Sequence, residues 1–175
     1  MNAEKKCERL LDAVGEIAFE GEYLEHSRYG NGHINDTFLV KFRQRDGSVR
    51  NYILQRINHE IFTDPAALME NIEGVTSFLQ QKVRERHGDP AREAMSLIRT
   101  KDGKPFYRDV NSCYWRGYVF IENSISLDRA ETPEQFYESG VGFGSFQSLL
   151  SEYPAATLHE TIQKFHDTPD RYSNF

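Results

Sequence analysis

Residues 34–57 read INDTFLVKFRQRDGSVRNYILQRI, with the dipeptide Asp46-Gly47 near the centre. Asp-Gly between two extended runs is a strong signal for a tight hairpin turn. The flanking runs, 34–42 and 49–57, are rich in β-branched and aromatic residues, which favour strands. A further strand-like run at 23–29 precedes them across a turn at 30–33. The sequence therefore predicts three consecutive antiparallel strands.

Helical patterns lie on either side of these strands. Residues 4–19 place an apolar stripe opposite charged residues at helical spacing. Residues 65–86 do the same, and this second helix begins with the capping residue Asp64 and with Pro65 in its first turn. We expect it to end at the run 87–90, His-Gly-Asp-Pro, with Gly88 in the left-handed conformation.

More strand signals follow the second helix. Residues 96–100 and 105–108 flank Asp102-Gly103 and are expected to form another Asp-Gly hairpin. Residues 114–121 are rich in aromatic side chains and are predicted as the last strand of the sheet. The fold class is therefore α+β, with a five-stranded antiparallel sheet and a flanking helix.

Beyond residue 123 the sequence again shows patterns typical of helices. One helix is expected to open at Thr132-Pro133, and a last short helix is expected at about 158–165. Gly140, Gly142 and Gly144 lie inside the first of these. Each costs up to about 1 kcal/mol relative to alanine, which is tolerable where another backbone packs close. We divide the chain into an N-terminal helix (1–21), a region that contains the sheet (22–123), and a linker followed by further helices (124–175).

Composition narrows the class of protein. The 175 residues include 27 acidic and 21 basic side chains, a formal net charge of −6, which disfavours binding to nucleic acid or to an anionic membrane. The N-terminal 19 residues are charged throughout, so neither a signal peptide nor a membrane-spanning helix is predicted there. Cys7 and Cys113 are far apart and form no CxxC pattern, which predicts no disulfide framework and favours a reduced, cytoplasmic setting.

The turn Gly30-Asn31-Gly32 is the most suggestive local feature. Two glycines one residue apart let backbone approach a ligand, and exposed N–H groups in such a turn bind phosphate oxygens. A dinucleotide-binding turn requires a helix next, but a strand pattern follows here, and no Gly-Lys-Ser/Thr is present for a P-loop. Two readings remain: a kinase-type hairpin folded over nucleotide phosphates, or an ordinary hairpin turn.

Arg56 places a cation within the apolar run 52–57, as the lysine of the kinase Val-Ala-Ile-Lys strand does. Glu70 and Glu73 of the following helix are candidate acidic partners for it. The alternative is that Arg56 is a surface charge at a strand end and that both glutamates are solvated.

Four segments carry a likeness to a known family: 30–38 (GNGHINDTF), 53–58 (ILQRIN), 64–72 with Asp64-Pro65 and Leu68–Ile72, and 165–172 with Phe165–Pro169 and Arg171-Tyr172. In these, the chain resembles the aminoglycoside-phosphotransferase and choline-kinase superfamily, and within it the N-acetylhexosamine 1-kinases. The likeness runs from about residue 22 onward. It implies a protein-kinase-like, nucleotide-binding N-lobe followed by the first helices of a truncated helical C-lobe.

The resemblance also implies roles for particular residues. ATP would lie under the hairpin of Gly30, Asn31 and Gly32, and its adenine would lie against 120–123, which includes Phe120 and Glu122. Arg56 would meet the phosphates and Glu70 would hold Arg56, although Gln55 is an alternative for the phosphate contact. His33 would reach the hexosamine.

Catalysis in this superfamily needs an aspartate base in a His-x-Asp segment with an asparagine five residues on, and a further aspartate for Mg²⁺. His87-Gly88-Asp89 has the first letters, but Ala94 stands where the asparagine belongs, so we interpret the segment as a helix end. The Mg²⁺ ligands are expected outside this chain, and the chain alone is expected to be inactive.

Three alternatives stay open at the level of sequence. The chain is a nucleotide- or sugar-binding module without catalysis, a structural domain that self-associates, or part of another small-molecule phosphotransferase of the same superfamily. Apolar faces on the helices predicted at 133–152 and 158–165 make a homodimer the expected protein partner.

Overall fold

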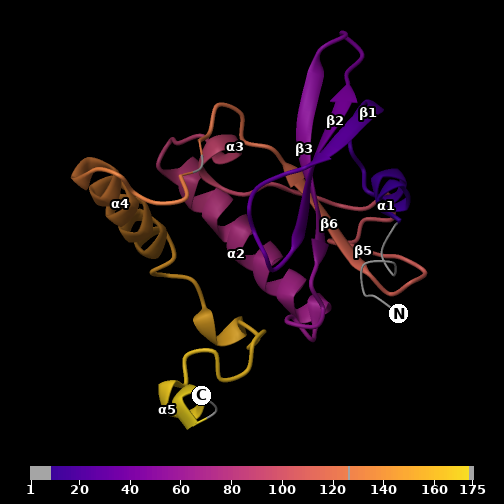
Figure 1. Ribbon diagram of the computed structural model, residues 1–175. Coiled ribbons are helices and arrows are strands. Elements are labelled where there is room, and N and C mark those ends of the chain that lie inside the picture. The colour runs from indigo at the N-terminus through magenta and orange to yellow at the C-terminus, as the bar shows by residue number, and fades with distance from the viewer. Residues whose placement is uncertain (1–8, 126, 174–175) are drawn as a thin grey trace.

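A six-stranded antiparallel sheet forms the centre of a mixed α+β fold in the computed structural model, which describes residues 9–125 and 127–173 (Figure 1). The strand order is β1-β2-β3-β6-β4, and β5 also pairs with β6. The strands are β1 (Glu22–Arg28), β2 (Asp36–Arg43), β3 (Val49–Ile57), β4 (Leu97–Ile98), β5 (Tyr107–Arg108) and β6 (Tyr114–Val119). Within the described ranges the helices are α1 (Leu10–Glu16), α2 (Pro65–Glu85), α3 (Pro90–Glu93), α4 (Pro133–Leu149) and α5 (Thr168–Ser173), with a 3₁₀ turn η2 (Ala155–Thr157).

The hairpin predicted around Asp46-Gly47 is confirmed. β2 and β3 pair in antiparallel register from Asp36↔Arg56 to Arg43↔Val49, and Gly47 takes a φ of +84°, which only glycine adopts at little cost. β1 pairs with β2 on the outer side, as expected.

The sheet has six strands rather than the five predicted, and the second Asp-Gly turn does not join two strands that pair with each other. The turn itself forms, with Gly103 at a φ of +84° and the Thr100 N–H donating to the Lys104 carbonyl at 2.9 Å. The runs on either side of it, however, both pair with β6: Leu97 lies opposite Tyr118, and Tyr107 lies opposite Trp115. The long strand β6 thus provides one edge for two short strands.

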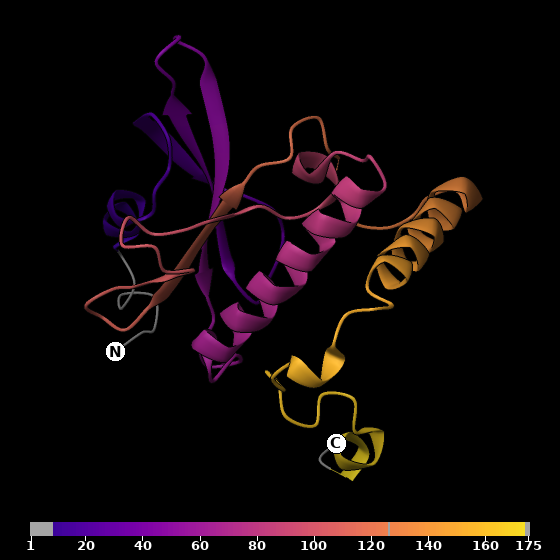
Figure 2. The same cartoon turned by 180° about the vertical axis from the view of Figure 1, so that it is seen from behind.

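Helices α1 and α2 lie on opposite sides of the sheet (Figures 1 and 2). The face toward α1 is apolar, and its buried core unites two groups: Leu10, Ala13, Val14 and Ile17 from α1 and its end, and Val40, Phe42, Tyr52, Leu54, Cys113 and Trp115 from the sheet. Contact here is close, because a Cβ built on Gly117 would lie 2.9 Å from the Phe19 ring and 3.0 Å from Ile17. A glycine in β6 therefore lets the segment after α1 approach the strand.

The start of α2 is as predicted, and its end differs. Asp64 caps the helix, with its Oδ1 accepting from the Ala67 N–H at 3.0 Å, and Pro65 is its first residue. The left-handed residue is His87, with φ +61°, rather than Gly88. Gly88 lies so close to Glu93 and Val83 that a Cβ would contact both. Asp89 caps the short helix α3 by accepting from the Ala91 N–H, which is a structural role.

The C-terminal segments extend away from the sheet on the side of α2 (Figures 1 and 2). α4 buries none of its residues, and a Cβ on Gly140, Gly142 or Gly144 would meet nothing within 4 Å, so no backbone packs on these glycines in this structure. The helix predicted at 158–165 is absent. The next helix is α5, which begins at Thr168, and the preceding residue Asp167 accepts from the Asp170 N–H through its Oδ1 at 3.0 Å.

Two further predictions concern membrane-spanning helices and disulfide bonds. No helix in the described part of the chain is long and apolar enough to cross a membrane. Cys113 is buried and disulfide-bonded, whereas the spacing of the two cysteines predicted no disulfide framework. Cys7 lies outside the described residues.

Candidate functional site

A cavity of about 340 Å³ lies beneath the turn that follows β1. It is enclosed by this turn, by strands β2, β3 and β6, by the segment before β4, and by the connection that leaves β6. Its lining residues are Tyr29, Gly30, Gly32, Thr37, Ile53, Met95, Tyr118, Val119, Phe120, Ile121 and Ser124. The cavity thus combines a mainly apolar wall with a few polar groups, as small-molecule sites commonly do.

The turn acts as a cover that contacts both sides of the cavity. Its base is closed by the Tyr29 N–H, which donates to the Thr37 carbonyl at 2.9 Å. The Tyr29 ring meets the Phe120 ring edge to face, with centroids 5.5 Å apart. At the tip, the Asn31 amide donates to Asp128 Oδ1 at 3.5 Å. Gly30 takes a φ of +76°, so the tight path of this cover depends on glycine.

Strand register places Gln55 and Arg56 on opposite faces of the sheet. Side chains alternate along a strand, so Tyr52, Leu54 and Arg56 share the face toward α1, while Ile53 and Gln55 share the face toward the cavity and α2. Arg56 lies opposite Asp36 and Trp115 in its two neighbouring strands. Of the two residues that the sequence left open for the phosphate contact, Gln55 therefore lies on the face of the sheet toward the cavity, and Arg56 lies on the opposite face.

Arg56 is held by Asp36 in an ion pair, with Nε donating to Oδ2 at 2.7 Å. Arg28 donates to the other carboxylate oxygen at 3.0 Å. Burial opposes ionisation of Asp36, but the hydrogen bonds and charges of both arginines outweigh it and lower the pKa of the carboxyl. This cluster joins three strand ends on the face away from the cavity.

Asp36→Asn is expected to lower the free energy of unfolding by about 1–2 kcal/mol at pH 7, since it removes charge-assisted bonds that are partly solvent-screened. Because the pKa of Asp36 is lowered by folding, its contribution is present above the ordinary carboxyl value of about 3.9 and is lost as the pH falls through the lower folded-state pKa. Urea unfolding of both proteins at pH 7 and at about pH 3 measures this. An equal loss at both pH values would show that the ion pairs are not the cause.

Glu70 does not hold Arg56 in this structure. Its carboxylate lies 2.7 Å from Nε2 of His159, and the neighbouring Asn71 exchanges two hydrogen bonds with the His159 backbone, at 2.8 and 2.9 Å. Glu73 pairs with Arg99. These α2 side chains therefore contact His159 of the C-terminal segment and Arg99, which directly follows β4. The sequence had predicted that they would contact Arg56 of the third strand instead.

Glu122 and His33 do not line the cavity. The Glu122 side chain accepts from the Asn51 amide at 2.8 Å, and the Glu122 backbone carbonyl accepts from Arg92 at 2.9 Å. Glu122 therefore links the connection after β6 to β3 and to α3. His33 is exposed on the cover. Of the residues that the sequence singled out, the structure brings Gly30, Gly32 and Phe120 together around one cavity, while Asn31 does not line it.

The sequence did not single out the residue with the most unusual environment, Arg116. It lies opposite Gln55 in the register of β3 and β6 and is 9% exposed. Its Nε and Nη2 both donate to Gln55 Oε1, at 2.9 and 2.6 Å, and Gln55 in turn donates to Thr37 Oγ1 at 2.7 Å. Burial lowers the pKa of Arg116, an effect that Tyr118 partly offsets. Its signal in the sequence is a single cation within the aromatic run 114–118.

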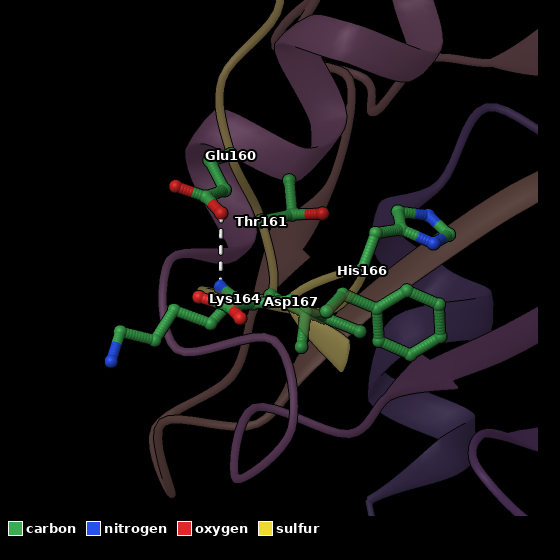
Figure 3. Close-up of a pocket in the computed structure, with 7 residues that line it drawn as sticks. Glu160, Thr161, Lys164, His166 and Asp167 are labelled. Atoms are coloured by element: carbon green, nitrogen blue, oxygen red, sulfur yellow. Dashed lines mark hydrogen bonds between the residues drawn. The ribbon is translucent and has the colours of Figure 1, made fainter. Parts of the chain in front are cut away.

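A second hollow, of about 570 Å³, lies at the segment 160–167 (Figure 3). Glu160, Lys164 and Asp167 are among its lining residues, and the Lys164 N–H donates to the Glu160 carboxylate at 3.0 Å. All of its lining comes from one short segment, so no elements distant in sequence converge there. Asp167 caps α5 and His166 contacts the Phe165 ring, so the contacts of both residues are local.

No set of three or more histidine, cysteine, aspartate or glutamate side chains among residues 9–125 and 127–173 is arranged to hold a metal ion. A search against models of protein families finds no match for this chain.

Proposed function

We propose that this chain is the nucleotide-binding part of an ATP-dependent kinase that phosphorylates the anomeric hydroxyl of an N-acetylhexosamine. The observation that carries the proposal is the cavity beneath the glycine-bearing turn. A cover with exposed backbone, closed against Phe120 by Tyr29, lies over an apolar floor formed by Ile53 and Tyr118. This is the arrangement that a kinase uses to bind a purine nucleotide beneath a glycine-rich hairpin.

The cavity has the composition that a planar base requires. Ile53 and Val119 offer apolar surface on neighbouring strands, while Thr37 and Ser124 offer hydroxyl groups at the wall. Burial of the faces of the base would provide most of the binding free energy, and the few polar groups would orient it. In this proposal the connection after β6, including Phe120, lies along the edge of the base.

Phosphoryl transfer itself needs groups beyond this cavity. It requires Mg²⁺ on the phosphates and an aspartate that orients and deprotonates the acceptor hydroxyl. In the proposal these groups come from residues outside this chain, and His33, exposed on the cover, faces the acceptor sugar. The chain alone then binds ATP and transfers no phosphoryl group.

Calorimetric titration of the purified chain with ATP and with adenosine tests the proposal. Saturable binding of both ligands is expected, and no sugar 1-phosphate is expected when ATP, Mg²⁺ and N-acetylhexosamine are added. Failure of both ligands to bind would refute the nucleotide site. Formation of sugar 1-phosphate by the pure chain would show that its own residues supply the catalytic groups.

The helix α4 favours self-association as a second property. Its large apolar side chains are exposed, with Phe136 at 74% and Phe143 at 71% of their full accessible surface. Soluble monomers rarely expose so many aromatic rings on one helix. Light scattering is expected to show a homodimer, and a monomer at all accessible concentrations would exclude one.

A further inference from the structure

Arg116 is a buried cation with no carboxylate partner in the part of the chain that the structure describes. A guanidinium carries five N–H donors. Two of them donate to Gln55, and a third lies 3.8 Å from the Met69 sulfur of α2, which is a weak acceptor. Two donors therefore remain for another group. Because a buried charge is costly unless it is paired, this arrangement favours an anionic ligand.

The position of Arg116 relates this charge to the cavity. Tyr118 and Ile53 form the floor of the cavity, and Arg116 and Gln55 each lie two residues farther along the same two strands, on the same face. Two residues along a strand span about 7 Å. Gln55 is also bonded to Thr37, which lines the cavity. Arg116 and its partner Gln55 thus continue the cavity floor toward α2.

Gln55 fixes the orientation of this group. Its carbonyl oxygen accepts both Arg116 bonds, and its amide nitrogen donates to Thr37. The neutral amide holds the guanidinium without cancelling its charge, which a carboxylate at this position would do. A preorganised guanidinium of this kind suits the oxygens of a phosphate group.

From these contacts we infer that Arg116, oriented by Gln55, is an anion-binding subsite that takes a phosphate group of the nucleotide whose base occupies the cavity. The identity of this ligand rests on the proposed function, whereas the preference for a phosphate-type anion rests on Arg116 itself. The subsite replaces Arg56, which lies on the other face of the sheet, as the cation for the phosphates.

The test compares titrations of the full chain with ATP, adenosine and inorganic tripolyphosphate. Arg116→Met removes the charge and keeps an apolar side chain of similar length. Gln55→Glu keeps Arg116 but gives it a carboxylate partner, so it retains the fold even if Arg116→Met does not. Both variants are expected to weaken ATP binding about 10- to 100-fold, the loss typical of charge-assisted hydrogen bonds. Adenosine binding should stay within about twofold, because the cavity itself is unchanged.

Arg56→Met is the matched control, since it removes a cation from the neighbouring position on the opposite face of the same strand. It should leave ATP and tripolyphosphate binding within about twofold. The inference is overturned if Arg116→Met and Gln55→Glu bind ATP as tightly as the unaltered chain, or if Arg56→Met alone loses it. If the unaltered chain binds tripolyphosphate but neither adenosine nor ATP, the proposed function fails, and loss of tripolyphosphate binding in both variants still supports the anion subsite.

Discussion

Asp109→Ala is expected to lower the free energy of unfolding by about 3–5 kcal/mol, a large share of the total stability of an ordinary domain. The carboxylate is 4% exposed and organises the approach to β6. One oxygen accepts from the Asn111 and Cys113 N–H groups at 2.8 and 2.9 Å, and the other accepts from the Trp115 indole at 3.0 Å. Alanine would leave buried donors without an acceptor, which costs more than the loss of a solvated bond.

Trp115 is the single tryptophan of the chain, so its fluorescence follows urea unfolding directly. Asp46→Ala is a matched control, because Asp46 also accepts from a loop N–H two residues ahead, at 2.9 Å, but in an exposed turn. It is expected to cost less than about 1.5 kcal/mol. Asp109→Asn keeps one carbonyl acceptor and should lie between the two. Equal losses for Asp109→Ala and Asp46→Ala would show that burial does not set the cost.

The first half of the sheet was predictable because its information is local. The hairpin between β2 and β3 needs only the Asp46-Gly47 turn between two strand-forming runs, and the start of α2 needs only Asp64 and Pro65. The number of strands was not predictable in the same way. β5 has two residues and exists because β6 is long enough to pair with two separate segments.

The turn that covers the candidate site could be predicted from the sequence, whereas the buried Arg116 could not. Gly30 and Gly32 carry a local turn signal, and Phe120 follows a recognisable strand. β3, in contrast, is covered by helices on both sides, so its apolar run has no alternation that would tell which of Gln55 and Arg56 faces the cavity. Only the pairing register shows that Gln55 lies beside Arg116, since these residues are 61 positions apart in the chain.

A substitution in the cavity floor is expected to distinguish binding of the base from binding of the phosphates. Ile53 is 3% exposed and forms part of the cavity floor. Ile53→Trp would place an aromatic ring in the space of about 340 Å³ where the base is proposed to bind. Affinity for ATP and for adenosine is expected to fall together, by at least about 30-fold, because most of the apolar contact of the base is lost. Calorimetric titration of both ligands measures it.

Leu39→Trp is the control for this variant. Leu39 lies opposite Ile53 in the register of β2 and β3, on the same face of the sheet, but does not line the cavity. It should change either affinity by no more than about threefold, while urea unfolding shows whether both variants retain the fold. The ligand pattern distinguishes this effect from that of Arg116→Met, which is expected to weaken ATP binding and to spare adenosine. If Ile53→Trp folds and binds adenosine as tightly as the unaltered chain, the base does not occupy this cavity, and the nucleotide site lies elsewhere on the molecule.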